Sequence, residues 1–524
     1  MLSKRRILLL IVFLSFGCTH ILSGQFFQGK LLDQTSNEPI VFATIRLKER
    51  ALGVISNEDG SFRVPLSFQE KGSALEISCM GYQSQIIPLS QLEQATTNLI
   101  YLTPSLFQLA ETTVQGRRGR RPTAKQIIRY AIQNIPNNYD ANAFNLIGYY
   151  RDYQWKGSTY SNLNEALVKV VDNGFESIDY HDLNFGLYTY EKNLEFPVDS
   201  FAAKRYDYNA RDKFISNADF STTYAANELV LLLIHDAIRN YQVRTYSFIY
   251  QLEQDFIRNH RFGAVKRTNY GDQPVYKISF RRNKTPFQAR GSIYIDENSF
   301  AIRKLEYAMY KQQFDDDSPS KFNLFKKDLL YEIIVEYQQF QEKMYLNYIS
   351  FHNQFTLRRP PKFRIEDVKL NWSKQEIKVT FNRPASNTPR RFSVRYKDKK
   401  LPIVGGYEAG PSSWVFIFPK APQKRTVALE ALFADAKANQ LSGLAIEMAE
   451  LKDAQGNGLG VREEEVLEQY REFFTQKIEA TRRSLFPSFQ YVNKNRSLGH
   501  PSQHTFPELD TNYWMNTPLR KIDN

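Results

Sequence analysis

The stretch Gly53-Val54-Ile55-Ser56-Asn57-Glu58-Asp59-Gly60-Ser61-Phe62 indicates how the first part of this 524-residue chain folds. Apolar residues stand on both sides of Asn57-Glu58-Asp59-Gly60, a run of residues that favour turns. Two short strands joined by a tight turn have this pattern. The stretch therefore predicts β-structure in which strands return quickly.

Short β-type runs continue on both sides of this stretch. A second turn signal, Met80-Gly81, separates two of them. Short strands at this spacing predict an antiparallel β-sandwich over residues 25–104. The runs are Phe26–Leu32, Ile40–Leu47, Ser61–Leu66, Ala74–Cys79, Gln85–Leu89 and Asn98–Leu102.

Four segments of this block resemble the carboxypeptidase regulatory-like domain. The resemblance implies a seven-stranded prealbumin-like sandwich, common at the N-terminus of envelope proteins in Gram-negative bacteria. It implies a fold and no reaction, because that domain is an accessory without catalytic residues. The segments are Gly29–Asp33, Glu38–Ile45, Gly53–Phe62 and Ile77–Tyr82.

The N-terminus has the parts of a secretory signal peptide. A basic start, Met1–Arg6, precedes the apolar run Ile7–Phe16, which has about half of the roughly 20 residues that span a bilayer. We expect cleavage near Gly24 and export to the periplasm or the outer-membrane surface. Lipidation at Cys18 stays open, although Ser15 stands where a lipoprotein signal prefers Leu, Val or Ile.

Composition and charge exclude several classes of protein. With 42% hydrophobic residues, 24 Gly and 22 Pro, the chain is not disordered, collagen-like or a coiled coil. Removing Lys4, Arg5 and Arg6 lowers the net charge from +13 to +10. Export and the lack of a recognisable motif argue against nucleic acid, which leaves anionic envelope material as the accessible counter-charge. Cys79 is the only cysteine after Cys18, so the mature chain forms no internal disulfide.

A second block follows the basic run Arg117–Arg121, which is typical of a solvated linker. We expect a helix from Thr123 to Pro136, a strand at Phe144–Tyr153 and a helix near Tyr224–Asn240. Five longer strands then predict one curved antiparallel sheet. They are Val275–Arg281, Ala289–Asp296, Ala301–Met309, Leu330–Phe340 and Met344–Leu357. Tyr149–Asp152 and Asn164–Val168 resemble the corresponding region of uncharacterised envelope proteins.

Short strands return in the third block. Glu376–Pro384, Ser413–Phe418 and Glu450–Asn457 resemble a bacterial Ig-like domain, which implies a second β-sandwich. Apolar residues on one side of Arg462–Arg483, with acidic residues first and basic residues last, predict an amphipathic helix. In the polar tail after it, Tyr513-Trp514 is expected to pack on the body of the protein.

The predicted fold class is mainly β with some α. A prealbumin-like sandwich comes first, then an α+β domain with a curved sheet, and then an Ig-like sandwich followed by a helix. The expected boundaries are a signal peptide at 1–24, the first sandwich at 25–104, a linker at 105–122, the central domain at 123–360, the Ig-like sandwich at 361–460, the helix at 461–486 and a tail at 487–524.

We predict no catalytic, cofactor-binding or metal-binding residue and no cofactor. Zinc-peptidase spacings, a phosphate loop and a Gly-x-Ser-x-Gly elbow are absent. His500 and His504 have i, i+4 spacing, but Pro501 between them argues against a helical metal pair. His235 is expected to be a core or boundary residue with satisfied polar atoms, and Cys79 a buried, inert thiol.

Two functions stay open. The first is a non-catalytic envelope protein with a binding or structural role, whose aromatic central block contacts a glycan, lipid or protein. The second is an unrecognised hydrolase of envelope or dietary polymer, because paired carboxylates in the central block would leave no spacing in the sequence. The run Asp315–Asp317 is expected to be a solvated loop rather than a calcium site. The lack of any nucleophile or metal motif favours the binding protein.

Overall fold

The protein is described from a computed structural model. Its fold is mainly β, as the sequence predicts. The described residues are 26–519, except 49, 51, 106–121, 157–158, 179–182, 207–210, 216–226, 245–248, 271–272, 285, 312–328, 439–441, 481–490 and 507–512.

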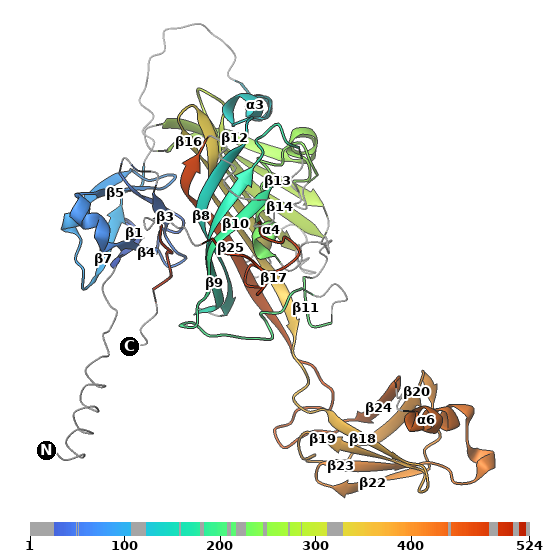
Figure 1. The fold of residues 1–524 in the computed structure, drawn as a ribbon. Coiled ribbons are helices and arrows are strands. Elements are labelled where there is room, and N and C mark those ends of the chain that lie inside the picture. The colour runs from blue at the N-terminus through green and yellow to red at the C-terminus, as the bar shows by residue number, and fades with distance from the viewer. Residues whose placement is uncertain are drawn as a thin grey trace, which may run out of the picture. The chain divides into compact units, whose positions relative to one another are not determined.

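The chain forms two compact units (Figure 1). Unit 1 contains residues 1–208, 215–355 and 467–524, and unit 2 contains 209–214 and 356–466. The main stretch of unit 2 thus interrupts the sequence of unit 1 between two of its strands.

The N-terminal part of unit 1 is a sandwich of two sheets, with strand orders β4-β1-β7 and β3-β2-β5-β6. The predicted turn is present, and Gly60 adopts a φ of 78° there, which suits glycine. The turn leads from one sheet to the other, and β1 runs parallel to β7, so the expected all-antiparallel sandwich is wrong. The strands are β1 (Phe26–Asp33), β2 (Thr44–Leu47), β3 (Gly53–Ile55), β4 (Ser61–Pro65), β5 (Ala74–Ser78), β6 (Gln85–Pro88) and β7 (Thr97–Leu102).

The rest of unit 1 is built on a large antiparallel sheet of 11 strands, in the order β10-β9-β8-β25-β17-β16-β15-β14-β13-β12. The two-residue strand β11 pairs with residues 356–357 at the end of β17, and these paired residues belong to unit 2. The five predicted strands correspond to β13–β17, so their expected antiparallel pairing in one sheet is confirmed, and the sheet is larger than expected. The bounds are β8 (Phe144–Lys156), β9 (Thr159–Asp172), β10 (Asn184–Lys192), β11 (Lys213–Phe214), β12 (Arg261–Tyr270), β13 (Gln273–Lys284), β14 (Phe287–Asp296), β15 (Ile302–Lys311), β16 (Leu329–Phe340), β17 (Lys343–Arg358) and β25 (Glu464–Glu479).

The helix predicted at 461–486, over Arg462–Arg483, is wrong. Glu464–Glu479 is strand β25, which lies between β8 and β17. A strand buried on both faces carries apolar residues on each, and this pattern can imitate the stripe of a helix. Phe473 packs in the core on one face of the sheet, whereas its neighbour Phe474 packs against Ile55 and Tyr348 on the other.

Helices cover one face of the central sheet. Thr123 caps α2 (Ala124–Gln133) as expected, and its hydroxyl accepts a hydrogen bond from the Gln126 amide. The chain after Pro136 does not simply leave the helix, because Ile135–Asn138 forms the short helix α3. The other helices are α4 (Glu228–Leu233), η5 (Leu252–Phe256) and α5 (Ile257–Asn259), so the expected helix at 224–240 is shorter than predicted.

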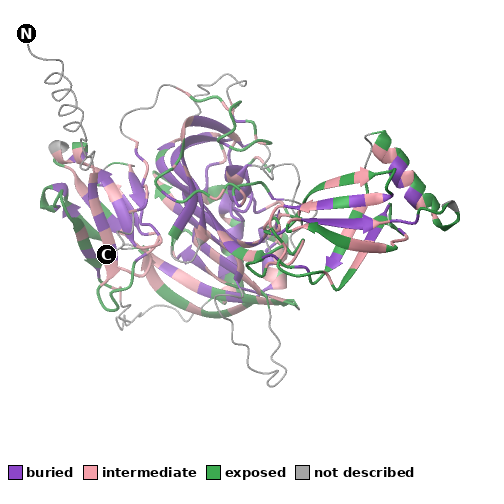
Figure 2. Ribbon diagram, turned by 90° about the horizontal axis from the view of Figure 1, so that it is seen from below, coloured by how far each residue is buried: buried purple, intermediate pink, exposed green. Residues whose placement is uncertain are grey.

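Burial follows this layering. The central strands of the sheet are mostly buried along their length (Figure 2). Side chains of α2 and α4 share one core with the strands beneath them. None of the described helices has both the length and the apolar character to cross a bilayer.

Unit 2 has its own core, enclosed by a four-stranded sheet, β18-β19-β23-β22, and a three-stranded sheet, β21-β20-β24. Its helix α6 (Val427–Lys437), capped by Thr426, is not predicted from the sequence. The strands are β18 (Ile365–Asn371), β19 (Glu376–Phe381), β20 (Arg391–Tyr396), β21 (Lys399–Lys400), β22 (Gly405–Gly410), β23 (Ser413–Ile417) and β24 (Leu444–Ala449).

Candidate functional site

A row of polar side chains crosses the middle of the central sheet on its helical side. The strand register places Asn164 beside Asp152 and Asp152 beside Arg471. Arg471 forms an ion pair with Glu228, the first residue of α4, and its Nη1 donates to Asn353 Oδ1 at 2.6 Å. The row therefore joins three neighbouring strands, β9, β8 and β25, with β17 and with the helix that covers them.

The carboxylates of this row have different environments. Burial, and then the charge of Glu228, raises the pKa of Asp152 to about 7. The Asp152 carboxyl accepts hydrogen bonds from Asn164 Nδ2 at 3.0 Å and from the Tyr150 hydroxyl at 3.1 Å. Glu228 instead faces the cationic Arg471. A carboxyl with a pKa near 7 can take up and release a proton near neutral pH, as general acid–base chemistry requires.

His235 lies near the same row. It is buried, its ring centroid is 4.2 Å from that of Phe351, and the Arg471 guanidinium lies 4.9 Å from the same ring. Burial, and then Arg471, lowers the pKa of His235 to about 3, so the imidazole is neutral at pH 7. Its Nδ1 has no hydrogen-bond partner among the described residues, so the expectation of satisfied polar atoms is wrong.

A second polar row lies on the opposite face of the sheet. Arg151 and Glu472 face each other in register and form an ion pair at 2.5 Å, with both side chains at most 3% exposed. The Tyr153 hydroxyl donates to Glu472 at 2.9 Å, and Arg151 also bonds Asn57 of the N-terminal sandwich. This row fixes the sandwich to the sheet and is closed to a ligand.

The sequence contains a signal for both rows that composition and motif analysis missed. Arg151-Asp152 and Arg471-Glu472 are adjacent opposite charges within aromatic runs. In paired strands, such neighbours place one complementary pair on each face of the sheet.

A third buried cluster contains a very small cavity. Arg239 donates to both carboxylate oxygens of Asp172 at 2.8 Å, and Tyr337 donates to Asp236 at 2.7 Å. Burial raises the pKa of Asp236 to about 6. The cavity beside these residues has a volume of about 20 Å³, enough for one water molecule and not for a substrate.

A much larger cleft, of about 340 Å³, opens in unit 2. It lies between β18 and β24, which stand at the ends of their two sheets. Its walls are apolar apart from two charged side chains. The lining residues are Arg364, Ile365, Ile446, Glu447, Met448, Ala449, Leu459 and Gly460.

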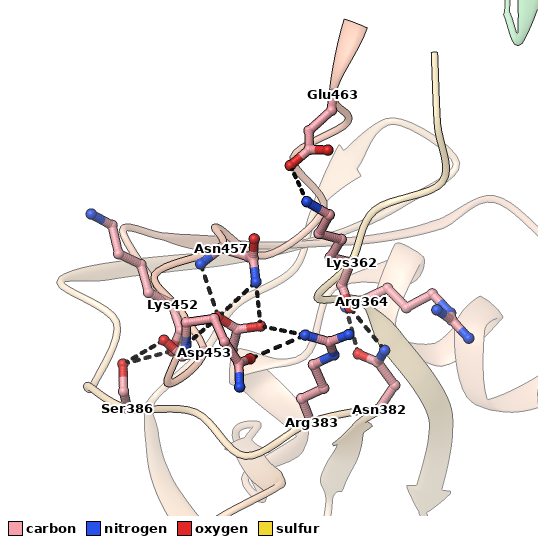
Figure 3. Close-up of polar contacts among 10 residues, drawn as sticks. Lys362, Arg364, Asn382, Arg383, Ser386, Lys452, Asp453, Asn457 and Glu463 are labelled. Carbon is pink, nitrogen blue, oxygen red and sulfur yellow. Dashed lines mark hydrogen bonds and ion pairs between the residues drawn. The ribbon is translucent and has the colours of Figure 1, made fainter. Parts of the chain in front are cut away.

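A hydrogen-bonded loop fixes one wall of this cleft (Figure 3). The buried Asp453 carboxylate accepts from the backbone and side-chain nitrogens of Asn457 at 2.8 Å each. Burial raises the pKa of the Asp453 carboxyl. The hydrogen bonds from Asn457 and Gln455 together lower it by a larger amount, so the pKa lies below its ordinary value. The loop thereby holds Leu459 and Gly460 in the cleft wall.

Polar contacts also hold the neighbouring segment of this cleft (Figure 3). Asn382 accepts from the backbone amide of Arg364 at 2.9 Å and donates to the carbonyl of Lys362 at 3.0 Å. Lys362 pairs with Glu463 at 2.6 Å. These bonds leave the Arg364 side chain exposed at the cleft.

The structure places the other residues singled out in the sequence. The exposed His500 ring contacts Ser502 at 2.8 Å, and the described residues contain no group of three or more His, Cys, Asp or Glu suited to a metal. Cys79 is partly buried, and burial raises its pKa to about 11, which disfavours the reactive thiolate. Cys18, Arg117–Arg121 and Asp315–Asp317 lie outside the described residues.

Comparison with known proteins identifies one part of the chain. Residues 27–114 match the CarboxypepD_reg-like domain, in agreement with the resemblance of the first block. No curated protein matches the chain.

Proposed function

We propose that this protein is a non-catalytic component of the bacterial cell envelope, and that the cleft of unit 2 binds an extended, acidic segment of a partner protein. The observation that carries this proposal is the position of the cleft between two edge strands. The central sheet supports it indirectly, because the polar rows of that sheet are buried and bonded to the rest of unit 1.

The shape of the cleft suits an extended polypeptide. Among the described strands, β18 pairs only with β19, and β24 only with β20. The outer edge of each can therefore offer backbone groups to an added strand. Ile365, Ile446 and Leu459 provide apolar contacts for the alternate side chains of such a strand.

Charge selects the chemistry of the partner. Residues 356–466 include 20 Lys and Arg but 13 Asp and Glu. The exposed Arg364 lies in the cleft itself. An acidic segment would thus be attracted to unit 2 and oriented at the cleft.

The location in the envelope rests on the signal-like N-terminus and on the CarboxypepD_reg-like domain. Such a location makes the periplasm or the outer-membrane surface the place where the partner is met. Nucleic acid is not expected as a partner there.

Binding to the full chain tests the proposal. A library of extended peptides of graded acidity would be screened by fluorescence anisotropy at several salt concentrations. We expect acidic peptides to bind, more weakly as salt rises. Arg364→Glu should weaken binding about tenfold, equivalent to about 1.4 kcal/mol.

Lys399→Glu is the matched control, because it makes the same charge change at an exposed position in β21, away from the residues that line the cleft. It should change binding far less than Arg364→Glu does. Equal effects of the two variants, or binding of envelope glycans or lipid vesicles in place of peptides, would refute the proposed occupant.

The buried Asp152 carboxyl and the partly buried Glu228 favour hydrolysis as a second candidate function. Burial, and then the charge of Glu228, raises the pKa of Asp152 to about 7, which suits a proton donor near neutral pH. The test is prolonged incubation of the full chain with envelope or dietary polymers. Product release that is lost in Asp152→Asn, with the fold intact, would establish the hydrolase and displace the binding role.

A further inference from the structure

We propose that the CarboxypepD_reg-like domain contains a peptide-binding site for a Trp-x-Asn sequence, and that the tail segment of the same chain, residues 513–519, occupies it. This inference uses residues of unit 1 and does not depend on the proposed function of unit 2.

Trp514 supplies the apolar part of the recognition. It is 5% exposed and belongs to the core of the N-terminal sandwich, with its ring centroid 5.5 Å from that of Phe68. Its indole Nε1 donates to the carbonyl of Arg63 at 2.9 Å. A residue from the far end of the sequence thus completes the core of the first domain.

Asn516 supplies the polar part. It is fully buried, and its Oδ1 accepts from the backbone amide of Arg63 at 2.8 Å. Its Nδ2 donates to the carbonyl of Ile55 at 2.7 Å and to Asn57 at 3.2 Å. A buried amide with donors and acceptors satisfied in this way distinguishes Asn from apolar residues of similar size.

The site lies along a strand edge. Arg63 belongs to β4, which stands at the end of its sheet, and both its amide and its carbonyl bond to the tail segment. As in peptide binding at a sheet edge, the edge strand offers its backbone groups; here the tail answers them with the side chains of Asn516 and Trp514. The two-residue spacing of Trp514 and Asn516 matches successive side chains on one face of an extended chain.

The central sheet contacts the same segment. Gln476 of β25 donates both to the carbonyl of Trp514 at 3.0 Å and to that of Gly53 at 3.1 Å. Thr517 donates to Glu165 of β9 at 3.1 Å. The tail segment is therefore bonded to the sandwich and to the sheet together, and its release would loosen the attachment of the first domain.

The direct test supplies the tail as a separate molecule. A chain ending at residue 512 would be mixed with a fluorescent peptide of residues 507–524. We expect saturable one-to-one binding to the shortened chain and at least tenfold weaker binding to the full chain, whose own segment fills the site. Peptides carrying Trp514→Ala or Asn516→Ala should each bind at least tenfold more weakly than the native peptide.

Equal binding of the native and altered peptides, or no binding to a shortened chain that keeps its β-sheet signal, would overturn the proposal. A wild-type dimer that dissociates on removal of residues 513–524 would also overturn it, because the segment would then come from a second copy.

A measurement on the full chain covers the case in which the shortened chain fails to fold. Asn516→Ala removes the acceptor of the Arg63 amide, so hydrogen exchange at Arg63 should accelerate at least tenfold. Trp372→Ala, a change at a partly exposed tryptophan of unit 2, is the control and should leave that rate unchanged. Unchanged exchange at Arg63 in Asn516→Ala would refute the site.

Discussion

Arg151 and Glu472 form the most deeply buried ion pair described in the sheet, with side chains 0% and 3% exposed. Removing one partner leaves an uncompensated charge in the interior, which typically costs about 3–5 kcal/mol. We therefore expect Arg151→Gln to lower the free energy of unfolding of unit 1 by about that amount. Urea denaturation followed by circular dichroism measures the change.

The same substitution at Arg267 provides the control. Arg267 pairs with Glu297 at 2.8 Å, but its side chain is 48% exposed. Exposed pairs contribute about 0–1 kcal/mol, so Arg267→Gln should have a small effect. Similar losses from the two variants would show that the row on this face does not stabilise the fold.

His235 makes the free energy of unfolding depend on pH. Burial, and then Arg471, lowers its pKa from 6.5 to about 3. Between these values the unfolded chain binds a proton that the folded chain does not, so stability falls as pH falls. Relative to the wild type, His235→Phe should gain about 2 kcal/mol in unfolding free energy on going from pH 7 to pH 5. A constant difference between the two proteins over this range would contradict the buried neutral imidazole.

Asp152 makes the free energy of unfolding change with pH in the opposite direction. Its pKa is raised from 3.8 to about 7, so the folded chain keeps a proton that the unfolded chain has lost, and stability falls as pH rises through this range. Relative to the wild type, Asp152→Asn should gain about 2–3 kcal/mol between pH 5 and pH 8. Urea midpoints at four pH values would show it. Asp367→Asn, at an exposed position of unit 2, should show no such trend.

Among the elements, β25 shows how the charge pairs specify register. Arg471 faces Asp152 on one side of the sheet while Glu472 faces Arg151 on the other. A slip of one residue would turn each of these side chains to the opposite face and separate both pairs. The adjacent opposite charges thus permit one alignment of two strands that lie more than 300 residues apart in the sequence.

The same strand shows what the sequence could not predict. In the strands β13–β17, buried and exposed residues alternate or short turns join neighbouring strands. The local sequence pattern is therefore enough to predict them. Neither face of β25 is solvent-exposed at its centre, which removes the alternation that identifies a strand. Its partner β8 is remote in sequence, and only that tertiary pairing decides between helix and strand. The row of Asp152, Arg471 and Glu228 was missed for the same reason.

A prediction about β25 follows from the strand order. Without it, β8–β10 and β12–β17 would have no shared neighbour in the sheet. A chain ending at residue 463 should therefore lose the cooperative unfolding of the central sheet, whereas a chain ending at residue 506 keeps β25 and should retain it, even though the first domain loses the tail segment. Thermal unfolding followed by circular dichroism distinguishes the two, and equal cooperativity would mean that β25 is dispensable.

At the scale of the whole molecule, the main stretch of unit 2 is inserted in the sequence between β17 and β25, which are neighbours in the central sheet. The backbone amide of Arg359 donates to the carbonyl of Glu463 at 3.0 Å, and Arg359 also pairs with Glu465 at 2.9 Å. The two ends of the inserted stretch are thus adjacent. Such ends can be joined by a tight turn of two residues.

Replacing residues 360–462 by Asn-Gly should therefore leave unit 1 folded. Its melting temperature should change by only a few degrees, because the core of unit 2 is separate from that of unit 1. The same deletion should abolish the binding of acidic peptides. Loss of unit 1 on deletion would show that the two units fold as one.

The place of β25 in the sheet also bears on how a cell handles unfinished chains. The ribosome delivers this strand after β8 and β17, between which it belongs. A chain stopped before residue 464 would present two long inner strand edges, which invite aggregation or proteolysis. Only a chain that extends through β25 can cover these edges. A premature stop codon upstream of β25 would therefore yield a product that is prone to proteolysis.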